Sequence, residues 1–555
     1  MPGGGVVPVL TTNAGPIIKP KTKKQAIRAV LASSFMAMGG ILFGYDTGTI
    51  SGIIAMEKFK QDFGTYYDVN VPTNTTPIPQ PGWSLSTGDT SLVVSILSAG
   101  TFVGALCGAP IADTLGRRWG LQVAMVVFCV GVILQLIAQA LPLFIVGRVV
   151  AGLGVGIVST IVPMFQAETA PRWARGAVTS GYQWAITIGL LFAALANNGT
   201  KDRTDTGSYR IPIGVQLGFA LILSFGTMLL PESPRWFVKK GKIEQAAKSL
   251  ATLNATDVDD ACVQAELADI RTNLEVELTH GNGSYLDCFR NNDRKNLTRT
   301  LVGTWLQAWQ QLTGINFIFY YGTQFFNSTG AGDPFVFTIV SNVVNVVCTV
   351  PGIWAMDRVG RRNILVWGAV WMAIMEGIVA IIGTVFGNSN PAAQRGLVAL
   401  VCLYVGGFAS TWGPAAWVVC GEIFPLAIRA KALSLCTASN WLWNFGIGYA
   451  TPYLVDSGPG KAGLGPKVFW IWTATCAMSA VFAYFCIVET KGLSLEEVDS
   501  LYCTTSPRLS AAANREMRAR RSDLETVGAH MVSDEAAEAD AAKRDVEYES
   551  KTVDA

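Results

Sequence analysis

The chain has 555 residues, of which half are hydrophobic and only 15% are charged. Soluble domains carry about 25% charged residues, so this composition indicates a membrane protein. The formal net charge of only +2 gives no indication of a nucleic-acid partner.

Uncharged segments of membrane-spanning length recur along the chain. Residues 90–112, 176–199, 211–231 and 334–356 contain no charged side chain, and each can cross a hydrocarbon core about 30 Å thick. With the other apolar segments they predict twelve spans, near residues 28–50, 90–112, 119–140, 143–167, 176–199, 211–231, 299–327, 334–356, 363–387, 396–421, 431–455 and 467–488. An even number of spans places both termini on the same side of the membrane.

The predicted spans form two sets of six around a polar segment. We expect an N-terminal six-helix half at 28–231, a linker with short helices at 232–298 and a C-terminal six-helix half at 299–488. The ends, at 1–27 and 489–555, are poor in large apolar residues and are expected to be largely disordered. The predicted fold class is an all-α membrane protein with two related halves.

Basic residues indicate the orientation of the chain. The turns after spans two, four, eight and ten carry arginine or lysine, and a basic segment from Lys19 to Arg28 precedes the first span. Short basic loops stay in the cytosol, so both termini are expected there. Glycosylation sequons lie in or beside the opposite loops at Asn74, Asn198 and Asn327, although such triplets also occur by chance.

Two charged phrases each occur twice, about half the chain apart. The phrase DTLGRR at 113–118 returns as DRVGRR at 357–362, and ETAP at 168–171 returns as EIFP at 422–425. Repeats in the same order indicate an internal duplication, which in a membrane chain is typical of a secondary transporter.

The acids and arginines of these phrases fall at predicted cytosolic helix ends, where they can pair and bridge neighbouring helices. Two interpretations stay open: a latch that closes the cytosolic side in one conformation, or charges that only set the topology. The candidate latch residues are Asp113, Arg117, Arg118, Glu168, Arg175, Glu232, Arg235, Asp357, Arg361, Arg362, Glu422, Arg429 and Glu489.

With further motifs, the sequence resembles the sugar porters of the major facilitator superfamily, and fungal hexose transporters in particular. These motifs are PESPRW at 231–236, QQLTGIN at 310–316 and VETKG at 488–492. The resemblance covers about residues 28–500. Ala109 and Val488 stand where the family usually has Gly and Pro, which concerns helix packing and helix ending rather than ligand chemistry.

Side-chain amides recur within the predicted spans. A sugar presents neutral hydroxyl groups that donate and accept, and an amide does both without the cost of burying a charge. Aromatic rings supply flat apolar surface for the C–H faces of the sugar. One amide alone is more simply explained by helix packing, whereas amides on several spans favour a shared carbohydrate site.

The resemblance implies roles for individual residues of this set. The residues that match the family's sugar contacts are Gln183, Gln310, Gln311, Asn316, Asn345, Trp417 and Asn444. Those that match positions lining or gating the cavity are Phe43, Tyr320, Tyr321, Asn440 and Trp441.

Two opposite charges lie inside predicted spans, Asp46 in the first and Arg148 in the fourth. Each costs about 2.5–3.5 kcal/mol near the centre of a span, so a partner or a function is expected. Protonation of Asp46 would remove its attraction to Arg148 and could couple proton uptake to alternating access. Proton-coupled sugar porters hold the same pair at the matching positions, but facilitative hexose carriers resemble the chain here too. A structural ion pair is therefore the alternative, and for a third intramembrane acid, Glu376, we expect a hydrogen-bonded structural role.

Other classes fit the sequence less well. No nucleotide-binding P-loop occurs, and only two histidines exist, neither in a metal-binding pattern, so neither an ATP-driven pump nor a metal-dependent enzyme is expected. No cofactor and no obligate protein partner is inferred. The sequence predicts a hexose carrier of the plasma membrane, most simply a glucose–proton symporter. A uniporter, a non-transporting sugar sensor and a drug-efflux carrier are the alternatives.

Overall fold

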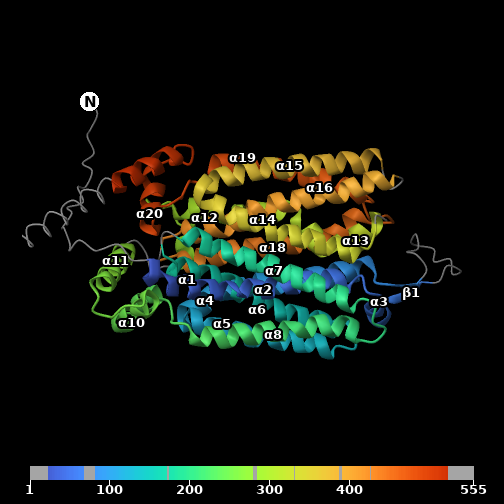
Figure 1. The fold of residues 1–555 in the computed structure, drawn as a ribbon, viewed down its shortest axis with the longest axis horizontal. Coiled ribbons are helices and arrows are strands. Elements are labelled where there is room, and N and C mark those ends of the chain that lie inside the picture. Colours follow the sequence, from blue (N-terminus) through green and yellow to red (C-terminus); the bar gives the residue numbers. More distant parts are fainter. Residues whose placement is uncertain are drawn as a thin grey trace, which may run out of the picture.

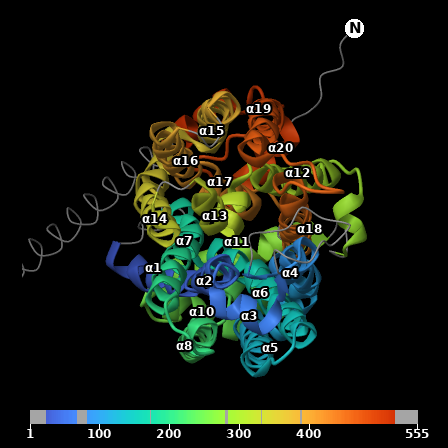
Figure 2. The ribbon, with the colours of Figure 1, turned by 90° about the vertical axis from the view of Figure 1, so that its right-hand side faces the viewer.

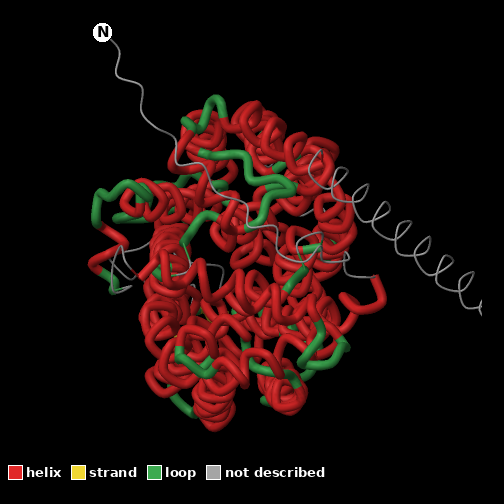
Figure 3. The backbone as a smooth tube through the Cα atoms, turned by 90° about the vertical axis from the view of Figure 1, so that its left-hand side faces the viewer, coloured by secondary structure: helices red, strands yellow, loops and turns green. Residues whose placement is uncertain are grey.

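The computed structural model describes residues 23–67, 82–171, 174–278, 284–329, 332–386, 390–425 and 427–522. Long helices run side by side along the longest axis, with short helices beyond one end and a small hairpin at the other (Figure 1). Helix makes up nearly all of this part of the chain (Figure 3). Asn74 lies outside the described residues.

The N-terminal half contains six spans. The first is built from two helices, α1 (Lys23–Ala37) and α2 (Gly39–Ile53). The other five are single helices: α4 (Thr87–Leu115), α5 (Arg117–Ile137), α6 (Leu141–Thr169), α7 (Arg175–Thr200) and α8 (Gly207–Leu229).

The C-terminal half repeats this arrangement with two interrupted spans. The seventh span consists of α12 (Asn296–Leu312) and α13 (Ile315–Thr329), and the tenth of α16 (Pro391–Ser410) and α17 (Trp412–Glu422). The remaining spans are α14 (Pro334–Val359), α15 (Arg361–Val385), α18 (Arg429–Val455) and α19 (Phe469–Cys486). The prediction of twelve spans in two halves is confirmed.

The break in the seventh span has a steric cause. Gly314 has φ 82°, a left-handed conformation that glycine adopts without strain. A Cβ atom there would also approach the ring of Trp472 to 2.5 Å. Thr313 and Gly314 therefore end α12 and redirect the chain into α13.

Ten spans in the described residues are long and apolar enough to cross a membrane by composition alone. The two that fall short are the α12–α13 pair and α18. The α12–α13 pair carries Gln310, Gln311 and Asn316, and α18 carries Asn440 and Asn444. Polar side chains inside spans are costly unless they are satisfied or used. These two spans thus mark where the side-chain amides of the interior are concentrated.

The most extensive contacts between the two halves are those of α4 with α18 and of α7 with α14. Viewed from the hairpin, the N-terminal half lies below and the C-terminal half above this seam (Figure 2). Within the N-terminal half, Cβ atoms at Gly152 and Gly156 would fall 2.2 Å from carbonyl oxygens of α4, so these glycines allow α4 and α6 to pack closely.

Short elements lie at both ends of the bundle. At one end are α9 (Pro234–Lys239), α10 (Ile243–Asn254), α11 (Ala261–Leu278), η1 (Leu286–Phe289) and α20 (Leu495–Thr504). At the other are α3 (Glu57–Phe63), β1 (Thr65–Tyr67), the antiparallel β2 (Gly82–Ser84) and η2 (Gly465–Val468). We name the first the charged end, because the turns at 113–118 and 357–362 lie there, and the second the hairpin end.

Part of the segment expected to be a disordered tail is helical. Besides α20, residues 510–522 form helix. Ser494 and Glu497 make a capping box at the start of α20, and Val498, Leu501 and Tyr502 are buried. Burial against the bundle supplies the apolar contacts that the composition of this segment does not suggest.

Candidate functional site

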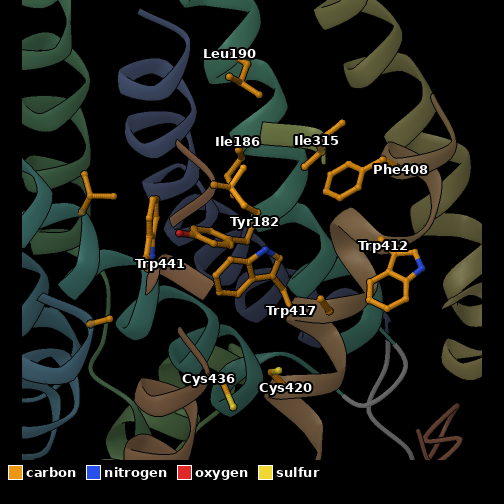
Figure 4. Packing of buried hydrophobic residues seen from close by; sticks show 14 of the residues in the cluster. Tyr182, Ile186, Leu190, Ile315, Phe408, Trp412, Trp417, Cys420, Cys436 and Trp441 are labelled. Carbon is orange, nitrogen blue, oxygen red and sulfur yellow. The ribbon is translucent and has the colours of Figure 1, made fainter. Parts of the chain in front are cut away.

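A narrow cavity of about 30 Å³ lies between the two halves. Its lining comes from both halves: Phe43, Thr47, Gln183, Ile186 and Leu190 from α2 and α7, and Gln310, Gln311, Ile315, Asn316, Phe319, Phe408, Trp417 and Asn440 from α12, α13, α16, α17 and α18. Figure 4 shows the side chains of Ile186, Leu190, Ile315, Phe408 and Trp417 gathered around this region. The lining thus combines amides with aromatic and aliphatic surface.

Gln310 connects the two interrupted spans. Its Nε2 donates to the carbonyl oxygens of Trp412 at 3.1 Å and Gly413 at 2.9 Å, at the break between α16 and α17. Its Oε1 accepts from Asn440 Nδ2 at 2.8 Å. The amide of Gln310 is therefore held in position by groups of α17 and α18, beside the cavity.

Gln311 lies at the centre of a second chain of amides. Its Oε1 accepts from Asn316 Nδ2 and, at 3.2 Å, from Asn444 Nδ2. Asn444 Oδ1 in turn accepts from the hydroxyls of Tyr320 at 2.8 Å and Ser98 at 2.6 Å. Asn444 and Tyr320 thus stand directly behind the lining and orient the amides that face the cavity.

Three other candidate residues are buried near the cavity without lining it. Asn345 of α14 is fully buried, and its amide has no hydrogen-bond partner among the described residues. Trp441 packs on Phe43, with ring centroids 4.6 Å apart. Tyr321 donates to Gly448 O at 2.7 Å and lines a different space, at the hairpin end.

Sequence reasoning missed the apolar part of the lining, which consists of Ile186, Leu190, Ile315, Phe319 and Phe408, and it missed Thr47. Ile186 and Leu190 follow Gln183 by three and seven residues, so they share its helix face and were detectable from that spacing. Phe408 gave no comparable signal, because its place depends on how α16 packs against α13.

A vestibule of about 320 Å³ opens at the hairpin end. Tyr321 and Gln324 of α13, Thr87 of α4 and Asp456 after α18 contribute polar groups to its wall. Tyr321 and Phe317 lie one helical turn or less beyond Asn316 and Phe319, which line the cavity. The vestibule therefore adjoins the cavity along α13.

At the charged end, the N-terminal half holds a buried ion cluster. Arg117 binds Glu168 through two nitrogens, Nε at 3.0 Å and Nη2 at 2.7 Å. Glu232 accepts from the backbone N–H groups of Arg117 and Arg118 at 2.9 and 3.0 Å. Burial raises the pKa of Glu232, and these N–H groups act against that rise.

The C-terminal half repeats the cluster with the matching residues. Arg361 binds Glu422 at 3.1 Å and Asp357 at 3.0 Å. Glu489 accepts from the backbone N–H groups of Arg361 and Arg362 at 3.0 and 3.2 Å. The described pairs of the repeated phrases thus lie within each half.

One ion pair that joins the halves at this end is Asp113–Lys431 at 2.6 Å, and Arg429 of the C-terminal half lies within electrostatic range of Glu168 of the N-terminal half. Asp113 also binds Lys239 of α9 at 3.1 Å. Arg429 donates to Phe424 O at 3.0 Å, and Arg235 lies in α9. The side chain of Arg175 lies outside the described part.

Asp46 and Arg148 are both buried, and their nearest charged atoms, Oδ2 and Nη2, are 3.7 Å apart. Neither of these two atoms has a hydrogen-bond partner among the described residues. Tyr320, which binds Asn444, lies within electrostatic range of both charges. The pair is therefore close to the amide chain behind the cavity.

The described sequons lie in helices at the hairpin end. Asn198 is half-buried near the end of α7, and Asn327 is exposed near the end of α13. Their glycosylation stays a prediction.

The family model described as "Sugar (and other) transporter" matches residues 32–502. The chain is 49% identical to the major facilitator-type transporter ecdD of Aspergillus rugulosus, covering 87% of this chain and 88% of that protein. It is 43% identical to the probable glucose transporter rco-3 of Neurospora crassa, with 85% and 79% covered. It is 40% identical to the high glucose sensor RGT2 of Saccharomyces cerevisiae, with 90% and 64% covered.

Solved structures of the xylose transporter XylE have the same fold. The proton:xylose symporter XylE bound to 6-bromo-6-deoxy-D-glucose aligns with a TM-score of 0.73 and 27% identity, over 86% of this chain and 99% of that one. The inward-open form of XylE from E. coli aligns with a TM-score of 0.63 and 26% identity, over 85% of this chain and 99% of that one. This protein is thus more similar to the sugar-bound form.

The fold and the family match together define a twelve-helix, multi-pass membrane transporter rather than an enzyme. The chain belongs to the sugar porter family of the major facilitator superfamily.

Proposed function

We propose that this protein carries a hexose, glucose in the first instance, across the plasma membrane by alternating access. The observation that carries the proposal is the cavity between the halves, in which Gln183 from one half faces Gln310, Gln311 and Asn316 from the other. A ligand bound by both halves can be released when they rock apart at one end. The names of the relatives, a probable glucose transporter and a proton:xylose symporter, support a monosaccharide as that ligand.

The residues around the cavity are proposed to act in two ways, by contacting the sugar or by orienting the residues that contact it. Gln183, Gln310, Gln311, Asn316 and Trp417 are proposed to contact the sugar. Asn440 and Asn444 orient Gln310 and Gln311 by hydrogen bonds, and the aromatic ring of Trp417 provides apolar surface for a sugar face. Phe43, Tyr320, Tyr321 and Trp441 are proposed to line or gate the path. Asn345 is proposed to join the contacts only after movement of α14.

Transport by the cavity is tested by sugar uptake in a host cell stripped of its own hexose carriers. We expect radiolabelled glucose uptake to be restored. Replacing Gln310 or Asn316 by Ala is expected to raise the KM about tenfold, which corresponds to about 1.4 kcal/mol of lost binding. Asn363→Ala, which removes an exposed amide outside the cavity, is the matched control and is expected to leave the KM unchanged. Unaltered uptake by both cavity variants at normal surface levels would refute the site.

Proton symport is the proposed mode of coupling. Asp46 and Arg148 form a buried pair that protonation of Asp46 would weaken, and Tyr320 links this region to Asn444 behind the cavity. Glucose is expected to alkalinise the medium of cells that express the protein, and Asp46→Asn is expected to abolish this response. Downhill uptake without proton entry in the unmodified protein would establish a uniporter instead.

The charged end is proposed to face the cytosol, where the two ion clusters act as a latch. Each cluster fastens the helix ends of one half, and Asp113–Lys431 joins the halves. With the latch closed and the vestibule at the hairpin end, the conformation is the one that receives sugar from outside.

A sugar sensor is a second candidate, because the high glucose sensor RGT2 is 40% identical to this chain. A sensor without transport would not restore uptake in the carrier-deficient host. The uptake measurement therefore distinguishes the two functions directly.

A further inference from the structure

Glu376 is a fully buried acid in α15 of the C-terminal half. Neither carboxyl oxygen makes a hydrogen bond of good geometry among the described residues, although the Cys476 thiol and the Tyr404 hydroxyl lie close enough to interact with it. The titratable side chains that interact with the carboxyl are Tyr404 of α16 and Cys476 of α19, and no lysine or arginine of the packed elements α14, α16, α17, α19 or η2 does so. This lone acid is unusual, since a buried polar group normally has a partner.

Both neighbours of Glu376 donate to the same backbone oxygen. The Tyr404 hydroxyl donates to Thr313 O at 2.6 Å, and the Cys476 thiol lies 3.8 Å from that oxygen. Thr313 is the residue at which α12 ends, and its own hydroxyl donates to Gln310 O at 2.7 Å. Tyr404 and Cys476 therefore fix the break in the seventh span, within reach of Glu376.

The geometry of this break sets the positions of the cavity amides. Gln310 and Gln311 stand just before it and Asn316 just after it, and all three line the cavity. Phe408, one helical turn after Tyr404 on α16, lines the cavity as well. A change in how Thr313 is held would therefore move the amides against one another.

The charge state of the acid decides which partner the two donors take. A neutral carboxyl group leaves the Tyr404 hydroxyl and the Cys476 thiol free to bind Thr313 O, as observed. An ionised carboxylate is an acceptor only, and a stronger one than a carbonyl oxygen. In an apolar interior without a cation, it would draw both donors away from Thr313.

We propose that Glu376 is a proton-bearing positioning residue for the sugar site, which holds the Thr313–Gly314 break in its binding geometry only while its carboxyl is protonated. This inference rests on the proposed function as a sugar carrier. It adds a proton-sensitive group in the C-terminal half, separate from the Asp46–Arg148 pair in the N-terminal half. Low pH then favours sugar binding in two ways, through the geometry of the Thr313–Gly314 break and through the Asp46–Arg148 pair.

The test is glucose affinity as a function of pH, measured on the purified full-length protein in lipid vesicles between about pH 5 and pH 9. The unmodified protein is expected to lose about fivefold in affinity toward alkaline pH, the factor that corresponds to one lost hydrogen bond. Glu376→Gln, which mimics the neutral acid, is expected to keep the acid-side affinity at every pH. The residue-376 wild type and Glu376→Gln are both also measured in an Asp46→Asn background, so that titration of Asp46 does not contribute.

A second variant keeps the test decisive if Glu376→Gln does not reach the membrane. Tyr404→Phe removes one of the two donors and is expected to weaken glucose binding at acid pH and to flatten the pH dependence. The inference is overturned if Glu376→Gln follows the pH curve of the unmodified protein, if that curve is flat, or if Tyr404→Phe binds as the unmodified protein does. Absence of glucose binding at every pH in the unmodified protein would instead refute the proposed function.

Discussion

Gln311 and Asn444 connect the cavity with the buried Asp46–Arg148 pair. Gln311 accepts from Asn444, Asn444 accepts from Tyr320, and Tyr320 lies within electrostatic range of both charges. A sugar hydroxyl that competes for the amide of Gln311 disturbs the first of these bonds. Hydrogen bonds thus lead from the cavity to Tyr320, and an electrostatic interaction leads from Tyr320 to the charge on Asp46.

Gly314 is the residue on which the break in the seventh span depends. Gly314→Ala places a Cβ atom 2.5 Å from Trp472 and forces a non-glycine residue into a left-handed conformation. The strain of about 1–2 kcal/mol and the overpacking of about 1–3 kcal/mol are expected to lower thermal stability and glucose affinity together. Thermal unfolding in detergent and glucose binding measure the two effects.

Gly446→Ala is the matched control for this substitution. Gly446 lies inside α18 with no atom near its Cβ position, so alanine is expected to be neutral or to stabilise the helix by up to about 1 kcal/mol. Equal melting temperatures for the two variants would contradict the steric account of the break.

At the scale of elements, the spans could be predicted from the sequence because a charge-free segment of 20 residues or more is long enough to cross the hydrocarbon core. Gly314 is the glycine of the amide-rich segment QQLTGIN, and glycine permits a local break within a span. The sequence does not reveal α20 or the helical residues 510–522, because both depend on tertiary contacts. Arg299 of α12 lies over the ring of Tyr502 in α20, and Asn514 donates to Glu489 O at 3.0 Å. Phe408 of the cavity lining was missed for the same reason, because packing of α16 against α13 decides its place.

The docking of α20 depends on its cap and on one buried arginine. Ser494 accepts from Glu497 N at 3.1 Å, and Asp499 binds Arg299 of α12 at 2.7 Å. Ser494→Ala is expected to destabilise α20 by about 1 kcal/mol and to speed amide hydrogen exchange in 495–504 about fivefold. Ser500→Ala, an exposed serine of the same helix that makes no cap, is expected to leave exchange unchanged; equal acceleration by both variants would contradict the capping role.

At the scale of the whole molecule, the repeated phrases predicted two related halves, and the structure pairs their charges in the same way in each half. What the repeat could not predict is the contact between halves. Lys431 meets Asp113 only because α4 packs against α18, a pairing that no local pattern in the sequence indicates.

Lys431→Met removes an ion pair that joins the halves at the charged end and leaves both internal clusters intact. A partly buried pair is worth about 1 kcal/mol, so the population open at the charged end is expected to rise about fivefold. The distance between spin labels at the exposed positions Trp119 and Asn363, in a background without the eleven native cysteines, measures this population.

Lys239→Met is the control that distinguishes loss of the ion pair between the halves from loss of a cation beside Asp113. Lys239 binds the same carboxylate at 3.1 Å, but it belongs to α9, which packs on α6 and α10 rather than on the other half. Removal of Lys239 takes a cation from Asp113 without cutting the connection to α18, so the label distances are expected to stay as in the unmodified protein. An equal shift in both variants would mean that the carboxylate acts within its own half, and that the contact between the halves at the charged end does not depend on the Asp113–Lys431 pair.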